Sequence, residues 1–225
     1  MIRLVTVLCF AAALGSTQTR TMTQAGHRME LVLERLDRDT WRAVDPGLVL
    51  AQGDRVRFKF RTNFDGFLYV TNQSTSGAYE QLFPRGETGQ DNRIAASKEY
   101  QVPATSAAFR IAGPAGFETV YWLVTPARLN DAAPRDEHLP ASKVAPNLIP
   151  RCDDTILKSR GDCVDPSAGP KLVPRGEPLP QNLAAPEIGR EQRDLLFLRQ
   201  KNTAVISSPV PLAGPVIYEF RLAHR

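Results

Sequence analysis

Two cysteines in the middle of the chain could take part in disulfide, metal or nucleophile chemistry. Cys152 and Cys163 bracket residues 153–162. The flanking CDD and GDC contain no CxxC pair, and no histidine lies beside them, so the spacing does not favour a metal site. If Cys9 is removed with an N-terminal signal, the remaining count is even, which in an exported protein favours a disulfide. We therefore predict a Cys152–Cys163 disulfide and no metal.

The segment between these cysteines ends in Arg160-Gly161-Asp162, the tripeptide that animal adhesion receptors read. A loop closed by a disulfide would preorganise such a ligand and lower the entropic cost of binding. However, a match of three residues arises frequently by chance. We interpret the loop mainly as a structural element that the disulfide stabilises, and we do not expect integrin-type binding. The three residues remain candidate contacts.

Catalytic signatures are missing from the sequence. The histidines His27, His138 and His224 lie far apart along the chain. None of the motifs HExxH, GxSxG, the phosphate-binding loop or the dinucleotide fingerprint occurs. We therefore predict no enzyme activity, no catalytic residues and no cofactor.

The charge of the chain excludes one class of partner. The 225 residues carry a formal net charge of +4, and lysine and arginine are spread along the chain. A nucleic-acid-binding protein would be expected to cluster them in a stripe or patch. The length suffices for one good hydrophobic core. We expect a globular protein without a nucleic-acid partner.

The N-terminus has the pattern of a secretory signal. Arg3 precedes an apolar run from Leu4 to Leu14, and small residues follow at the place where a signal peptidase cleaves. The run is too short for a membrane-spanning helix, which needs about 20 apolar residues. The pattern predicts a signal peptide at residues 1–15, cleaved near Gly15–Ser16, then a flexible segment at 16–27. The mature protein should be periplasmic or secreted, without a transmembrane segment.

From Met29 to Thr125, hydrophobicity alternates with a period of two, which indicates β-strands. In RVRFKFRTN, apolar residues face one way and basic residues the other, and NFDG follows as a turn signal. The pattern predicts a β-hairpin from Arg55 to Gln73, with one buried face and one solvent-exposed face. The basic face consists of Arg55, Arg57, Lys59 and Arg61.

Downstream of Thr125, the amino-acid composition changes. Prolines recur through residues 127–193, which predicts a long irregular insertion that contains the cysteine loop. Strand patterns return at Asp194 to Arg199, at TAVISS and at PVIYEFRLAHR. We expect an all-β protein: one antiparallel β-sandwich, Ig-like or jelly-roll-like, spanning residues 28–225 and interrupted by the insertion.

Several short motifs occur in a characteristic order: Gly53-Asp54, Asp65-Gly66, Tyr69, Leu82-Phe83-Pro84, Asn92-Arg93-Ile94, Val102-Pro103 and Gly116-Phe117-Glu118. In this order and spacing the chain resembles the bacterial domain of unknown function 4384 family, from about Met29 to Pro126. The resemblance implies a β-sandwich-like, often exported domain, which in some members is fused to peptidase-like or kinase-like domains. It implies no catalytic residues, because no activity is established for the family as a whole.

The sequence thus predicts a non-enzymatic interaction or scaffold module of the bacterial envelope or secretome, which binds a protein through loops or a sheet face. The candidate surface comprises the basic face and residues 160–162. One alternative is a module that binds carbohydrate or an envelope polymer through aromatics such as Trp41 or Tyr69. A third reading is an accessory domain to a separate enzyme.

Overall fold

The computed structural model describes residues 26–129, 137–138, 149–152, 155–173, 196–208 and 216–225. The predicted signal peptide at 1–15 lies outside these residues, as do nearly all of the segment predicted to be flexible and much of the proline-rich insertion. In this described part, no helix is long and apolar enough to cross a membrane.

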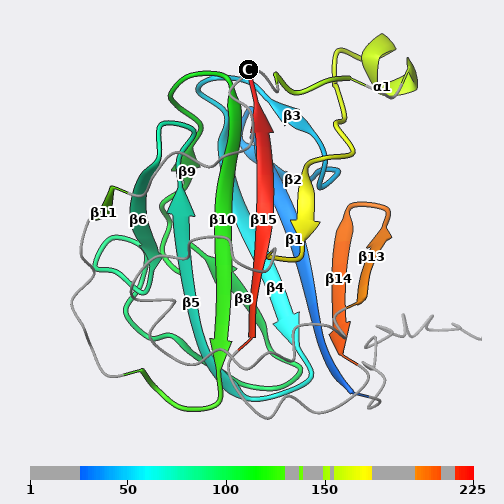
Figure 1. Ribbon diagram of the computed structural model, residues 1–225. Helices are drawn as coiled ribbons and strands as arrows, with labels where there is room; N and C mark the ends of the chain where they lie inside the picture. The colour runs from blue at the N-terminus through cyan, green and yellow to red at the C-terminus, as the bar shows by residue number, and fades with distance from the viewer. Residues whose placement is uncertain (1–25, 130–136, 139–148, 153–154, 174–195, 209–215) are drawn as a thin grey trace, which may run out of the picture.

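Two β-sheets pack face to face, which confirms the predicted all-β sandwich (Figure 1). The first sheet has the order β13 (Leu196–Gln200), β14 (Thr203–Ser208), β1 (His27–Asp37), β4 (Arg55–Thr62) and β8 (Glu99–Val102), with β2 (Thr40–Ala43) beside β1 and β9 (Phe109–Arg110) beside β4.

The second sheet has the order β11 (Glu137–His138), β6 (Ala78–Phe83), β5 (Gly66–Gln73), β10 (Gly116–Thr125), β15 (Val216–His224) and β12 (Gly169–Lys171). In addition, β3 (Val49–Leu50) lies beside β15, and β7 (Arg93–Ile94) lies beside β5. Pairing between the described strands is antiparallel except between β3 and β15. The sandwich is therefore built mainly from antiparallel strands that are far apart in the sequence.

Alternation along each strand decides which side chains enter the core. In β4, Val56, Phe58 and Phe60 are buried, while the basic residues between them are exposed or half-buried. Successive side chains of a strand point to opposite faces, so one face of β4 packs on the second sheet. The predicted two-faced character of this strand is confirmed.

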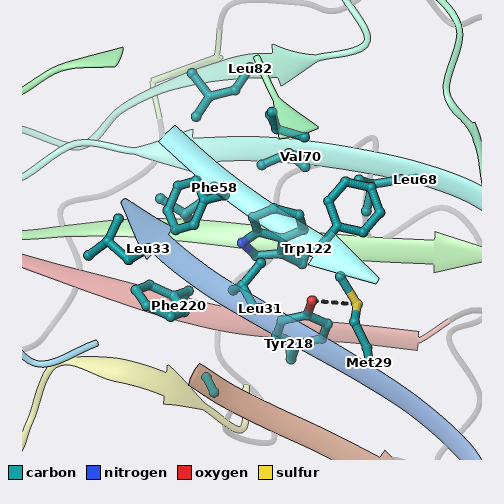
Figure 2. Close-up of a cluster of buried hydrophobic side chains, with 14 of the residues drawn as sticks. Met29, Leu31, Leu33, Phe58, Leu68, Val70, Leu82, Trp122, Tyr218 and Phe220 are labelled. Atoms are coloured by element: carbon teal, nitrogen blue, oxygen red, sulfur yellow. Dashed lines mark hydrogen bonds between the residues drawn. The ribbon is translucent and has the colours of Figure 1, made fainter. Parts of the chain in front are cut away.

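Trp122 lies at the centre of the interface between the sheets (Figure 2). Its ring meets Phe58 edge to face at 5.2 Å and Phe60 at 5.8 Å, both from β4. On its own sheet it stacks with Tyr218 at 6.3 Å. These contacts tie the two sheets together through aromatic packing.

Tyr218 also carries a hydroxyl into this apolar interior. The hydroxyl donates a hydrogen bond to Sδ of Met29 at 2.8 Å, across the two sheets (Figure 2). Full burial disfavours the charged phenolate and raises the pKa of Tyr218 well above its usual value. The tyrosine is therefore a neutral core residue that uses its polar tip for one contact.

The hairpin predicted from Arg55 to Gln73 is wrong. β4 belongs to the first sheet and β5 to the second, so Asn63–Asp65 carry the chain from one sheet to the other. One edge of β4 is occupied by β1 and the other by β8 and β9. No edge remains for β5. The NFDG turn reverses the chain without pairing its two arms.

Other predicted strands are found with adjusted bounds. The stretch RIAASKEYQVP contains two short strands, β7 and β8, which lie in different sheets. In the stretch AAFRIAG, the strand is limited to Phe109–Arg110. The strand patterns noted at Asp194 to Arg199 and at TAVISS are found as β13 and β14, which pair as an antiparallel hairpin.

The insertion is less irregular than predicted. Its residues Gly169–Lys171 form β12, which pairs with β15 at the edge of the second sheet. An edge strand tolerates Pro170, whose missing amide hydrogen is not needed on the outer side. On the outer face of the same sheet, Val173 packs in a cluster with Ile217 and Leu123. The insertion therefore covers a sheet face that would otherwise expose apolar residues.

β15 completes the sandwich, as predicted. Val216, Tyr218, Phe220 and Leu222 face the interior, and Ile217 and Ala223 of the opposite face are also buried. A strand buried on both faces explains why this C-terminal segment is so rich in apolar residues.

Trp122→Ala is expected to lower the free energy of unfolding by about 3–5 kcal/mol, because it empties the centre of the interface. Trp41→Ala is the matched control. Trp41 is half-buried and mainly supports the guanidinium of Arg57, 4.3 Å from its ring centre, so its loss should cost about 0.5–1 kcal/mol. Guanidinium unfolding followed by far-ultraviolet circular dichroism measures both. Equal losses would contradict the central role of Trp122.

Candidate binding site

The predicted disulfide is present. Cys152 and Cys163 are bonded, with their Cα atoms 4.8 Å apart. The loop that they close contains α1 (Thr155–Ser159). On either side of an isolated bridge between Leu48 and Val164, Val49 N donates to Cys163 O at 2.7 Å and Asp165 N donates to Gly47 O at 2.7 Å. The disulfide thus anchors the loop beside β3, at the edge of the sandwich.

Arg160, Gly161 and Asp162 form the C-terminal cap of α1. Asp162 N donates to Leu157 O at 2.9 Å, and Gly161 N donates to Lys158 O at 3.1 Å. This pair of bonds defines a Schellman cap, which favours glycine at the residue with positive φ. Gly161 has φ +84°. The glycine of the tripeptide therefore has a structural reason for its position.

The aspartate of the tripeptide is also engaged within the protein. The Asp162 carboxylate lies 3.4 Å from a guanidinium nitrogen of Arg35 on β1. Asp165 accepts from the backbone N of Arg151 at 2.6 Å and from Ser167 N at 2.8 Å. These carboxylates serve the loop's own fold. In the described residues, no group of His, Cys, Asp and Glu side chains could hold a metal ion.

The basic face of β4 is compensated by neighbouring carboxylates. Arg57 donates to Glu34 on β1 at 2.5 Å, and Lys59 Nζ lies 3.1 Å from Glu99 on β8. Arg61 donates to Glu30 at 2.9 Å. These pairs form a cross-strand ladder of alternating charge. The three residues therefore do not present a free positive patch.

Arg55, the fourth residue of that face, stands apart from this ladder. It is exposed and lies opposite Arg110 in the pairing of β4 with β9. The structure thus brings Arg57, Lys59 and Arg61 into one ladder, while Arg160 to Asp162 belong to the cap of α1. The predicted candidate residues do not form one surface.

A cleft of about 360 Å³ opens between the two sheets near β9. Its apolar floor is built by Phe58, Leu82, Val120 and Leu222, which come from both sheets. Its polar lining consists of Asn72, Ser74, Glu80, Glu118 and Arg110. Residues 108–112 form one side. We call this space the cleft.

Near the cleft, the inward-facing residues of three neighbouring strands change from apolar to polar. Along β5, Leu68 and Val70 are followed by Asn72, and along β10, Glu118 precedes Val120. Along β15, His224 continues the inward-facing series after Leu222. The interior of the second sheet is therefore apolar through most of its length and polar at this end.

Glu118 is the centre of the resulting hydrogen-bond network. Asn72 Nδ2 donates to its Oε2 at 2.7 Å, and Thr75 N donates to its Oε1 at 3.3 Å. His224 Nε2 lies 3.3 Å from the same Oε1, and the His224 side chain is 1% exposed. Burial by itself would raise the pKa of Glu118, but the hydrogen bonds from His224, Asn72 and Thr75 outweigh it, so the pKa is lowered.

Gly116 makes the approach of Thr75 to this network feasible. A Cβ atom at Gly116 would lie only 2.8 Å from Cγ2 of Thr75. The glycine and the glutamate of the Gly-x-Glu motif therefore have linked roles: one leaves room for Thr75, and the other accepts its hydrogen bond. The motif was noted from the sequence, but no sequence motif marked His224 as the partner of Glu118.

The comparison with protein families agrees with the resemblance seen in the sequence. Residues 49–128 match the model of the family described as Domain of unknown function (DUF4384). The match begins at Val49 rather than near Met29, so β1, β14 and β15 lie outside it. Neither the curated proteins nor the solved structures include a significant match to the chain.

The ionised Glu118 should make stability depend on pH. Its pKa in the folded protein is below the ordinary value of 4.5, so the network stabilises the fold above that pH and loses its effect as the pH falls through the folded pKa. Compared with Glu118→Gln, the wild-type protein should therefore lose stability more steeply in this acid range. Urea midpoints at a series of pH values, with Glu99→Gln as an exposed control (its side chain is 65% exposed), test this. Parallel curves for wild type and Glu118→Gln would contradict the assignment.

Proposed function

We propose that the chain, which carries a DUF4384 segment at residues 49–128, is a non-enzymatic binding module of the bacterial envelope or secretome that takes part of a protein partner into the cleft. The cleft is the observation that carries the proposal. Its volume of about 360 Å³ lies at the small end of the range usual for ligand sites, and it combines an apolar floor with a few polar groups. This size suits one or two side chains.

The edge of the first sheet beside the cleft favours a peptide segment as the occupant. β9 pairs with β4 on one side, and no strand in the described ranges pairs with its other side. An extended segment can bind such an edge through backbone hydrogen bonds while a side chain enters a neighbouring pocket. Phe109 and Arg110 of β9 line the cleft, so both modes of contact are available at one place.

The geometry around His224 supports a binding role over catalysis. A hydrolytic triad uses one ring nitrogen of histidine for the acid and the other for the nucleophile. Here, Glu118 Oε1 at 3.3 Å and Thr75 Oγ1 at 3.5 Å both lie at Nε2 of His224. This arrangement does not relay a proton from Thr75 to Glu118. The network instead holds polar groups in fixed positions at the cleft.

The proposed location outside the cytoplasm rests on the signal-like N-terminal sequence and on the Cys152–Cys163 disulfide. Structural disulfides form and persist mainly in oxidising compartments. The disulfide also supports a stabilising role for the insertion loop, because the loop's own backbone satisfies the Gly161 cap and Arg35 of β1 pairs with the Asp162 carboxylate.

A carbohydrate-binding role has less support. Of the aromatic residues that could stack on a sugar, Trp122 and Tyr79 are buried. The guanidinium of Arg57 lies over the ring of Trp41, and the hydroxyl of Tyr69 accepts a hydrogen bond from Leu129 N at 2.9 Å. Binding to envelope polymer is therefore retained as an outcome of the test.

Blocking the cleft tests the proposal. Ala112 is exposed and lines the cleft, so Ala112→Trp should fill its mouth without changing the core. Ala107 is exposed on the same segment outside the lining, so Ala107→Trp is the matched control. In cross-linking pull-downs from the source cell's envelope and medium, a partner should be captured by wild type and Ala107→Trp, with at least about a tenfold loss for Ala112→Trp.

Equal capture by all three baits would place the binding surface outside the cleft and contradict the proposal. Sedimentation of all three with envelope polymer, without a captured protein, would favour the carbohydrate-binding role instead. Unfolding curves of the two tryptophan variants should be similar, which separates a blocked cleft from a damaged fold.

A further inference from the structure

The charged groups of the cleft differ in how strongly they act on a ligand. Glu80 and Glu118 contribute two negative charges and Arg110 one positive charge, so the lining carries a net charge of −1. The Glu118 side chain is 12% exposed, whereas Arg110 is exposed to solvent. Solvent screens an exposed charge much more than a buried one. The electrostatic character of the cleft is therefore set mainly by Glu118.

Glu118 retains capacity for a further donor on the side of the cleft. Thr75 and His224 both contact its Oε1, and Asn72 Nδ2 donates to Oε2. A carboxylate oxygen can accept more than one hydrogen bond. Of the two carboxylate oxygens of Glu118, Oε2 therefore has a single partner among the described hydrogen bonds.

Asn72 adds a second acceptor at the same place. Its Oδ1 is buried and has no hydrogen-bond partner among the described residues. A buried acceptor without a donor costs free energy, and a ligand donor would recover it. Asn72 and Glu118 both line the cleft, so a donor bound at Glu118 Oε2 lies beside the Asn72 side chain.

The floor below these acceptors is apolar. Phe58, Leu82, Val120 and Leu222 suit a hydrocarbon chain and offer it no hydrogen bond. A group that fits the floor and the acceptors together must have an unbranched aliphatic stem that ends in a cation with several donors. Lysine has this form, because its stem packs on apolar surface while its ammonium group donates three hydrogen bonds.

We infer that the cleft selects a basic side chain, lysine in the first place, from the partner's segment beside β9. The stem lies on the floor of the cleft, and the ammonium group donates to Glu118 Oε2; Asn72 Oδ1, which is closed to solvent in the free protein, becomes a second acceptor as its side chain adjusts to the ligand. This inference rests on the proposed function and adds the chemistry by which the site recognises its partner. A partner segment with an acidic residue at this position would be rejected by the charge of Glu118.

Small probes test the selection directly. Nα-acetyl-lysine methylamide and Nα-acetyl-norleucine methylamide share the aliphatic stem, and only the lysine compound carries an ammonium group. In nuclear magnetic resonance titrations of the full folded protein, the lysine probe should shift amide signals of Asn72, Val120 and Ile111. It should bind at least about tenfold more tightly than the norleucine probe, the factor expected for a charge-assisted hydrogen bond.

Three variants of the protein complete the test. Glu118→Gln should remove the preference for lysine while leaving norleucine binding similar, and Glu87→Gln is the matched control that should leave both unchanged. Ala112→Trp should abolish the shifts with both probes. It provides a second line of evidence that does not alter the Glu118 network.

The outcomes separate the inference from the proposed function. Equal binding of both probes in the cleft, or lysine binding that survives Glu118→Gln, would overturn the selection for a basic group and leave the cleft as an apolar binding site. No response to the lysine probe would also overturn the inference. In that case, partner capture by Ala112→Trp still decides the proposed function independently.

Discussion

The structure depends on one packed interface, in which the inward side chains of two sheets meet around Trp122. The indole is fully buried and contacts Phe58 and Phe60 of the opposite sheet. Because strand side chains alternate, this interface fixes the orientation of every neighbouring strand. It also explains why the family segment at residues 49–128 is not a complete sandwich: β4 needs β1 at one edge, and β10 needs β15.

The same alternation produces the candidate site. If the inward-facing residues of β5, β10 and β15 were apolar up to the ends of the strands, the two sheets would pack together at this end as they do around Trp122. Instead, the inward-facing positions at this end carry Asn72, Glu118 and His224, which bond to one another or to Thr75. Buried polar groups persist when they are hydrogen-bonded, and Glu118 is held ionised by its donors. The cleft is the space that this polar end leaves beside β9.

Period-two alternation was sufficient to predict the fold class, the inward face of β4 and the presence of a strand at β15, because it reports burial directly. It could not predict pairing. The Arg55–Gln73 hairpin was wrong because the edges of β4 are taken by strands distant in sequence, such as β1. For the same reason, the carboxylates that compensate Arg57 and Arg61 were not foreseen. The disulfide was predicted, since cysteine count and spacing suffice. The contact of Glu118 with His224 needed the register of β10 and β15.

We propose that a protein partner occupies the cleft rather than the disulfide loop. The most direct measurement places a photo-reactive amino acid at Ala112 in one sample and at Arg160 in another, and maps the cross-linked peptides in the source cells by mass spectrometry. We expect the Ala112 probe to attach to one partner segment that contains lysine, and the Arg160 probe to give no specific adduct. A specific partner adduct at Arg160, with none at Ala112, would contradict the account.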